Sequence, residues 1–414
     1  MSTNDQTSTT EQTSTNDRTT TGTAATRLAK NLWSWASILD DGAREQAERT
    51  STMPFVFPHL ALMPDAHLGL GATVGSVIPT LRSIIPAAVG VDIGCGMVAV
   101  RTQYSAADIA GPALRDLRLA IEKAVPTSAG SYNKHLTGTA TARVAELEAL
   151  ADKDGFDPAR YAGSWRLQLG SLGSGNHFIE VSLDEEDRVW FFLHSGSRGV
   201  GNKIAQHHVA VARELMSRYW IDLPDKDLAY LVEGTDEFWA YIRELRWAQH
   251  FALLNREEMM DRVVAAFDAW SGLAPVQEVE RINCHHNFTE REHHFGKDVW
   301  VSRKGAIRAR EGDPGLIPGS MGTASYVVVG SGNALALDSA PHGAGREYSR
   351  SKARRTFTHD QLRQAMVGIE YRDTDAFIDE IPAAYKSIDR VMADAADLVE
   401  VCHTLRQIVN VKGD

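Results

Sequence analysis

The sequence has few cysteines and no long apolar run. Its three cysteines in 414 residues are odd in number and far apart, which argues against a disulfide framework and favours a reducing compartment. No apolar stretch approaches the roughly 20 residues that cross a bilayer, and the N-terminus carries no hydrophobic signal core. We therefore expect a cytoplasmic protein without a membrane partner.

Positive charge is also in short supply. The chain has 43 lysines and arginines against 54 aspartates and glutamates, which gives a formal net charge of −11. This balance argues against delocalised binding to nucleic acid, so a basic site would have to be local.

The two common nucleotide-binding loops are missing as well. "GLGATVG" has one residue too many between its last glycines for the dinucleotide fingerprint, and "GSRGVGNK" has Asn202 where a P-loop has its lysine. Glycine clusters beside His, Ser or Asn nevertheless recur in "HLGLGATVGSVIP", "GSLGSGNHF", "HSGSRGVGN", "IPGSMGTAS" and "HGAGRE". Any one cluster is better explained as a turn, but together they indicate a site where backbone amides approach an anion.

The pattern along the chain predicts one domain of mixed α+β class after a polar tail. Residues 1–25 are rich in Ser, Thr, Asn, Gln and Asp, and we expect them to be disordered; residues 26–414 show neither a linker nor an internal repeat. "HFIEVSL", "VWFFLHS", "DVWVSRKGAI" and "SYVVVG" are typical of strands. Helical periodicity is found at 106–125, 141–153, 228–270 (as more than one helix) and 358–366. The irregular order of helices and strands argues against a doubly wound parallel sheet.

Residues of metal-binding type lie in the same glycine-rich segments. Asp92 and Cys95 stand three residues apart in the apolar "VGVDIGCGM", and His177 and His194 lie at opposite ends of two expected strands that could pair. Either histidine of "NCHHN" could join them. Each residue alone is better explained as an ordinary core or surface group, but together they predict a metal site in which the Cys95 thiolate could bridge two ions. Thiolate and imidazole ligands by themselves favour zinc.

A series of these segments, in order, covers nearly the whole chain after the tail: "MPDAHLGLGATVGSVIP", "VGVDIGCGM", "LGSGNHFIE", "HSGSRGVGN", "WAQHFALLNR", "NCHHN", "RKGAIRA", "IPGSMGTAS", "HGAGREYSRSKA" and "VKG". Together they resemble the RtcB family of RNA-splicing ligases. The resemblance implies a single large domain, with β-sheets flanked by helices around a central two-metal cleft. It also implies joining of RNA ends with a 2′,3′-cyclic phosphate or 3′-phosphate to 5′-hydroxyl ends, with GTP and Mn²⁺.

The resemblance further implies roles for individual residues. Asp92, Cys95 and His177 would hold one Mn²⁺, and Cys95, His194 and His286 the other, so manganese replaces the zinc expected from ligand type. His342 would be the nucleophile that carries GMP before GMP passes to the RNA 3′-phosphate and is displaced by the 5′-hydroxyl. The guanine nucleotide site would be built from Asn176, His177, Phe178, Ile179, Glu180, His286, Asn287, Pro318, Gly319, Ser320, Met321, Ser325, His342, Gly343, Ala344, Gly345 and Lys412.

Two basic segments could bind RNA phosphates. "RKGAIRAR" and "REYSRSKARR" contribute Arg303, Lys304, Arg308, Arg310, Arg346, Arg350, Lys352, Arg354 and Arg355. From composition alone, a solvated basic face explains them equally well; their position beside "HGAG" favours phosphate binding. Leu70 of "HLGLG" stands where many relatives have lysine, so we expect an auxiliary RNA contact to be weaker.

Two other functions use the same residues. A two-metal phosphoesterase or cyclic phosphodiesterase would use the metal ligands but would not join RNA ends. A non-catalytic RNA-end binder would use the metal site only to bind phosphate. Both alternatives leave "HGAG" and Lys412 without a role. A lysine-nucleophile ligase is disfavoured because "KDG" at Lys153 lacks the KxDG spacing. We expect a monomer; the physiological RNA, repair as against splicing, and an accessory activating protein stay open.

Overall fold

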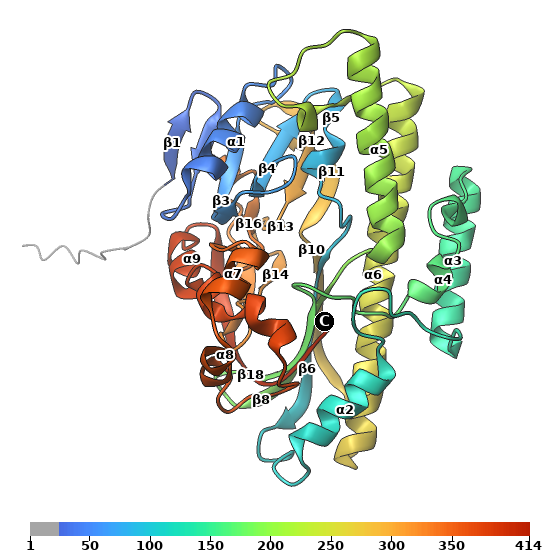
Figure 1. Cartoon of the computed structure of the whole chain (residues 1–414), viewed down its shortest axis with the longest axis vertical. Helices are drawn as coiled ribbons and strands as arrows, with labels where there is room; N and C mark the ends of the chain where they lie inside the picture. The colour runs from blue at the N-terminus through green and yellow to red at the C-terminus, as the bar shows by residue number, and fades with distance from the viewer. Residues whose placement is uncertain (1–24) are drawn as a thin grey trace, which may run out of the picture.

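The computed structural model describes residues 25–414 (Figure 1). Apart from Ala25, the expected tail lies outside these described residues. The chain builds two large β-sheets with helices on their outer sides, which confirms the mixed α+β class. Within residues 25–414, no helix combines the length and apolar character needed to span a membrane.

The larger sheet has eight strands in the order β10-β6-β8-β7-β18-β15-β14, with β17 paired to β18. "HFIEVSL" and "VWFFLHS" form the neighbouring antiparallel strands β7 and β8, and "SYVVVG" forms β15, as expected. The strands of this sheet are β6 (Gly96–Ser105), β7 (Phe178–Leu183), β8 (Arg188–Ser195), β10 (Glu278–His285), β14 (Pro314–Ile317), β15 (Ser325–Gly330), β17 (Glu370–Tyr371) and β18 (Val399–Lys412).

The second sheet has six strands in the order β1-β2-β3-β4-β12-β11. The expected strand "DVWVSRKGAI" is divided at Gly305, whose positive φ of 66° separates β12 from β13. The strands of this sheet are β1 (Thr26–Ala29), β2 (Leu32–Ser34), β3 (Leu60–His67), β4 (Val74–Thr80), β11 (Asn287–His294) and β12 (Lys297–Lys304). Two small sheets pair β13 (Ala306–Arg308) with β16 (Ser339–Pro341) and β5 (Ser83–Ile84) with β9 (Leu231–Val232).

The helices differ from expectation mainly at two places. The range 228–270 holds one helix, α6, which begins after the capping side chain of Thr235 and ends at Gly272 (φ 63°); neither glycine nor proline interrupts it. Helix α5 was not expected, because glycines in its first turn are typical of a loop. The helices are α1 (Asp41–Ser51), α2 (Leu114–Ala124), α3 (Gly138–Asp154), α4 (Trp165–Gln168), α5 (Arg198–Arg218), α6 (Asp236–Ser271), α7 (Arg350–Thr356), α8 (His359–Ala365) and α9 (Ile388–Asp394).

Short 3₁₀ helices complete the described chain. They are η1 (Pro86–Ala88), η2 (Pro158–Arg160), η3 (Lys226–Leu228), η4 (Ala334–Ala336), η5 (Asp375–Glu380) and η6 (Pro382–Ala384). The expected helices at 141–153 and 358–366 are confirmed as α3 and α8, whereas α2 covers only the second half of 106–125 because Gly111 and Pro112 precede it in a turn.

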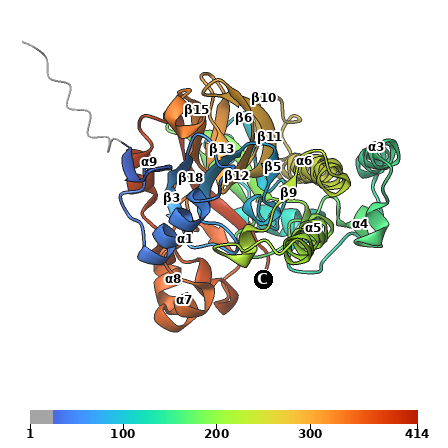
Figure 2. The same ribbon diagram turned by 90° about the horizontal axis from the view of Figure 1, so that it is seen from above.

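The two large sheets share an apolar core and enclose the site. Val77 and Val301 of the smaller sheet pack with Met97 and Phe192 of the larger one, all fully buried, and burial of such side chains stabilises the fold by about 1.5–3 kcal/mol each. Helices α5 and α6 run side by side along one flank, with α3 outside them, and α7 and α8 lie away from that flank (Figures 1 and 2). The main cavity of the site is lined by strands of both sheets.

Candidate functional site

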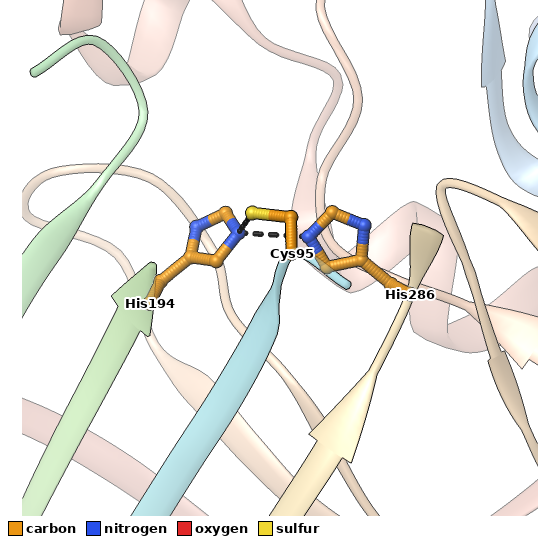
Figure 3. A group of neighbouring side chains, drawn as sticks. All are labelled: Cys95, His194 and His286. Carbon is orange, nitrogen blue, oxygen red and sulfur yellow. Dashed lines mark hydrogen bonds between the residues drawn. The ribbon is translucent and has the colours of Figure 1, made fainter. Parts of the chain in front are cut away.

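Three adjacent strands bring Cys95, His194 and His286 to one edge of the larger sheet. In the order β10-β6-β8, Gly96 pairs with His285 on one side and with Ser195 on the other, and Cys95, His286 and His194 are chain neighbours of these three residues. The side chains of Cys95, His194 and His286 converge there (Figure 3). Sγ of Cys95 is 3.3 Å from Nε2 of His194, which is 2.8 Å from Nε2 of His286.

A second group shares Cys95. Its Sγ atom lies 3.4 Å from Nε2 of His177, and this nitrogen lies 3.1 Å from Oδ2 of Asp92. The expected pairing of the strands that carry His177 and His194 is therefore confirmed, with Phe178 opposite His194. In each group one ligand atom per residue lies within 4.8 Å of the others, a spacing that suits a metal ion.

Hydrogen bonds at Nδ1 orient two of the ligand histidines. Nδ1 of His194 lies 3.1 Å from the carbonyl oxygen of Asn176, so this ring can donate outward and keep Nε2 as an acceptor. Nδ1 of His177 lies 2.9 Å from the carbonyl oxygen of Leu172 and 3.3 Å from Nη1 of Arg198, and its Nε2 faces Cys95 and Asp92. Burial lowers the pKa of His194 and His286 well below the ordinary value, which keeps both rings neutral. A neutral imidazole can bind a cation through a ring lone pair, and this set of thiol, imidazole and carboxylate groups fits divalent metals.

The Cys95 thiol needs a cation to ionise. Burial, reinforced by the nearby Asp92 carboxylate, raises the pKa of Cys95 well above its usual range. A metal ion that displaces the proton reverses this preference, because the thiolate is the binding form. Cys95 is 2% exposed and belongs to both ligand groups.

His342 lies beside this centre and is held by Asp65. Its ring centroid is 4.7 Å from that of His286. Nδ1 of His342 is 2.5 Å from Oδ2 of Asp65, a close contact without straight hydrogen-bond alignment, and the same oxygen accepts the His342 backbone N–H at 3.0 Å. Sequence reasoning missed Asp65, although the residue stands in "MPDAH"; a carboxylate inside a buried strand was the available signal.

A cavity of about 350 Å³ joins His342 to the metal-binding groups. It is lined by Asn176, Phe178, Glu180, His286, Asn287, Pro318, Gly319, Ser320, Met321, His342, Gly343, Ala344, Gly345 and Lys412, all expected in the nucleotide site. Three other expected residues lie off its wall: Ile179 is in the core, Ser325 contacts Glu180 through its hydroxyl at 3.4 Å, and His177 faces a second cavity.

Glu180 and Lys412 place a carboxyl group and an ammonium group on the wall of this cavity. Burial raises the pKa of Glu180 to about 8, against the opposing influence of Lys412. Nδ2 of Asn410 donates to Glu180 at 3.3 Å, and Nζ of Lys412 lies 3.2 Å from Oε2 of Glu380. The wall therefore offers donor and acceptor groups next to one another.

The expected basic residues divide into three sets. Lys304, Arg346 and Arg350 line the main cavity, and burial lowers the pKa of Lys304 to about 8. Arg303 is fully buried and paired with Glu292, so it does not reach RNA. The remaining expected residues lie outside the main cavity: Arg308, Arg310, Lys352, Arg354 and Arg355.

A second cavity, of about 380 Å³, reaches the same centre from another side. It shares Asp92, Asn176, Arg350 and Glu380 with the main cavity and adds Arg354 and Asp379. Leu70, which is 73% exposed, lies on the wall of the main cavity, and its carbonyl oxygen accepts a hydrogen bond from the Lys304 ammonium.

This chain is similar to known proteins over most of its length. The family model described as "tRNA-splicing ligase RtcB" matches residues 46–413. The RNA-splicing ligase RtcB of Escherichia coli (strain K12) is 47% identical over 396 residues, which cover 92% of this chain and 97% of that protein. The tRNA-splicing ligase RtcB of Pyrobaculum aerophilum is 32% identical over 423 residues, covering 86% and 87%. The RNA-splicing ligase RtcB of Mycobacterium bovis is 30% identical over 411 residues, covering 84% and 94%.

Proposed function

The chain belongs to the RtcB family and is an RNA ligase, and we propose that it joins RNA ends bearing a 2′,3′-cyclic phosphate or 3′-phosphate to 5′-hydroxyl ends, using GTP. The observation that carries this proposal is the position of His342, which Asp65 holds on the cavity wall beside His286. A non-catalytic RNA-end binder would have no use for this held histidine. The reducing cytoplasm, where we expect the protein, would keep Cys95 available as a ligand.

We propose that two Mn²⁺ ions bind at the two groups that share Cys95. Asp92, Cys95 and His177 would hold one ion, and Cys95, His194 and His286 the other, in agreement with their convergence within 4.8 Å. The inward-facing nitrogens of His177 and His194 support this assignment. When bound, such ions neutralise phosphate charge and polarise phosphorus–oxygen bonds.

His342 acts first, as a nucleophile. Asp65 keeps the proton on Nδ1, which leaves the lone pair on Nε2, and Nε2 attacks the α-phosphorus of GTP. An N–P bond forms as the bond between the α-phosphorus and the bridging oxygen breaks, and pyrophosphate leaves. The Asp65 carboxylate stabilises the positive charge that the ring acquires in this step.

Glu180 and Lys412 would select guanine. The guanine edge presents N1–H and a 2-amino group as donors and O6 as an acceptor, whereas adenine presents an acceptor at N1 and a donor at N6. The two guanine donors would favour the ionised form of Glu180, whose carboxylate accepts from both of them, and the Lys412 ammonium would donate to O6. A site whose buried polar groups pair only with guanine leaves them unpaired with adenine, so ATP is rejected.

The RNA phosphates would meet Lys304, Arg346 and Arg350 on the cavity wall. An oxygen of the RNA 3′-phosphate attacks the phosphorus of His342-bound GMP, so a P–O bond forms and the N–P bond breaks. The 5′-hydroxyl oxygen then attacks the RNA phosphorus, and GMP leaves as the phosphodiester closes. A cyclic end must first be opened by water to the 3′-phosphate.

The test is covalent labelling with GTP in the presence of Mn²⁺. We expect GMP to attach to the wild-type protein through an acid-labile, alkali-stable bond, as a phosphoramidate does, and the label to be lost in His342→Ala. Peptide mapping should place the adduct at His342. A wild-type protein that takes no label, or a His342→Ala variant that keeps it, would contradict the proposal.

A further inference from the structure

Arg256 is a fully buried arginine that the proposed reaction leaves without a role. It lies on α6, in the segment "WAQHFALLNR", and is 0% exposed. Its hydrogen-bonding partners among residues 25–414 are all neutral: the carbonyl oxygens of Gly94 and Ser195, Oδ1 of Asn283 and Nδ1 of His285. Burial lowers the pKa of Arg256 to about 10, and a buried charge of this kind is costly unless its contacts serve a purpose.

These contacts follow the ligands of one metal group. Nη1 donates to Gly94 at 2.8 Å and to Ser195 at 3.1 Å, and Nη2 lies 3.1 Å from Nδ1 of His285. Gly94 precedes Cys95, Ser195 follows His194, and His285 precedes His286. One guanidinium therefore touches a chain neighbour of every ligand in the Cys95, His194 and His286 group, and no residue next to Asp92 or His177.

The three contacts join segments that are far apart in the sequence. Gly94 lies two residues before β6, Ser195 ends β8 and His285 ends β10, where the regular pairing of the strands stops. Nε of Arg256 adds a 2.8 Å bond to Asn283, also on β10. Nδ1 of His285 is in addition 2.8 Å from the Gly94 carbonyl oxygen, so either tautomer ties His285 to this set of contacts.

The neighbouring residue extends the attachment of α6 to the same edge. Nδ2 of Asn255 donates to the carbonyl oxygen of Gly196 at 3.1 Å, and its Oδ1 accepts from the backbone N–H of Gly170 at 2.7 Å. Asn255 is also 0% exposed. The two consecutive buried residues Asn255 and Arg256 of α6 thus donate hydrogen bonds to the backbone that follows His194.

We propose that Arg256 is a positioning residue for the metal ion held by Cys95, His194 and His286. Its planar fork of donors fixes the backbone beside all three ligands, whereas an ammonium group carries its three donors on one freely rotating nitrogen. Without this support the two imidazole nitrogens, which lie 2.8 Å apart, lose their shared orientation toward one ion. The inference rests on the proposed metal centre and predicts that Arg256 matters to this ion far more than to the ion of Asp92 and His177.

The test is a titration of metal-free protein with Mn²⁺, followed by calorimetry, on wild type, Arg256→Met, Arg256→Lys and the control Arg118→Met. Arg118 is a buried arginine on α2 that pairs with Glu122 and Glu370, away from the site. We expect two ions in wild type and in Arg118→Met. In both Arg256 variants one ion should bind as in wild type and the other at least 10-fold more weakly, the size seen when a group that orients ligands is lost. Urea unfolding should show a similar loss of stability in Arg118→Met and Arg256→Met, so that instability alone does not explain the result.

The outcomes separate this inference from the proposed metal centre. Wild-type affinity for both ions in Arg256→Met would overturn the inference alone, whereas a wild-type protein that binds no Mn²⁺ would overturn it together with the metal centre. If Arg256→Met does not fold, Arg256→Lys decides: unchanged affinity for both ions contradicts the positioning role. Equal weakening of both ions in the Arg256 variants would also contradict it.

Discussion

Asp65 and His342, 277 residues apart in the chain, are in direct contact, with Nδ1 of the histidine 2.5 Å from Oδ2 of the carboxylate. The contact joins β3 of one sheet to the chain just after β16. Gly305 keeps the space beside the ring open, since a Cβ on it would lie 3.0 Å from Cε1 of His342. The histidine is thus oriented before any nucleotide arrives, which lowers the cost of ordering it during reaction.

The first prediction concerns this contact. Replacing Asp65 with Asn should slow covalent labelling by GTP roughly 10²- to 10⁴-fold, because the amide neither keeps the proton on Nδ1 nor stabilises a charged ring. Single-turnover labelling at saturating GTP measures the rate, and Mn²⁺ titration should show unchanged binding of both ions. A labelling rate within twofold of wild type would show that Asp65 does not orient the nucleophile.

Cys95→Ala should abolish labelling and reduce bound metal, because one residue serves both ligand groups. Elemental analysis after removal of free metal should find fewer than two ions per chain. Cys402→Ala is the matched control, since this cysteine is exposed and lies near the start of β18, whereas Lys412 of the site lies at its end. Two ions retained in Cys95→Ala would refute the bridging role.

Glu180 should make stability depend on pH. Its pKa of about 8 in the folded protein lies above the ordinary value of 4.5, so the folded state holds this proton more tightly than the unfolded state, and stability falls as pH rises from about 4.5 to about 8. Relative to Glu180→Gln, which does not titrate, wild type should lose up to about 4 kcal/mol of unfolding free energy between pH 5 and pH 8.5. Urea unfolding of the metal-free proteins measures the difference, and parallel pH curves would contradict the assignment.

Leu70→Lys should strengthen RNA binding without changing the labelling of His342. The side chain is 73% exposed on the wall of the main cavity, where an added ammonium group can meet an RNA phosphate. We expect an affinity gain of roughly threefold to tenfold at low salt that shrinks as salt increases. Leu68→Lys is the control, because Leu68 is exposed but does not line the cavity. An equal gain in both variants would indicate a general charge effect.

Much of the candidate site was predictable because its residues stand in short segments of unusual composition. The strands around His177 and His194 were expected to pair, and their register confirms it. The alternation of helices and strands was enough for the mixed class, but not for α5 or for the continuity of α6. Helix α6 packs against α2, α3, α5 and the four strands β6, β8, β9 and β10, so much of its surface is apolar and its period is hard to read.

In the basic segment "RKGAIRAR", side chains that are neighbours in the sequence have different surroundings in the structure. Arg303 and Lys304 are adjacent on β12, and successive strand residues face opposite sides of a sheet. Arg303 therefore points into the protein against Glu292, while Lys304 reaches the cavity. Composition alone treated both as candidates for phosphate binding.

The sequence by itself determined the residue types of the site, their glycine-rich settings and, through its resemblance to a family, the chemistry to expect. Tertiary structure decided which of these residues meet. In "NCHHN", residue type left the two histidines equal; at the end of β10 they diverge, so that His285 contacts Arg256 and Gly94 while His286 faces His194. The physical reason is the two-residue period of a strand, which sends adjacent side chains to opposite faces, and the pairing of β6 with both β8 and β10, which no local pattern specifies.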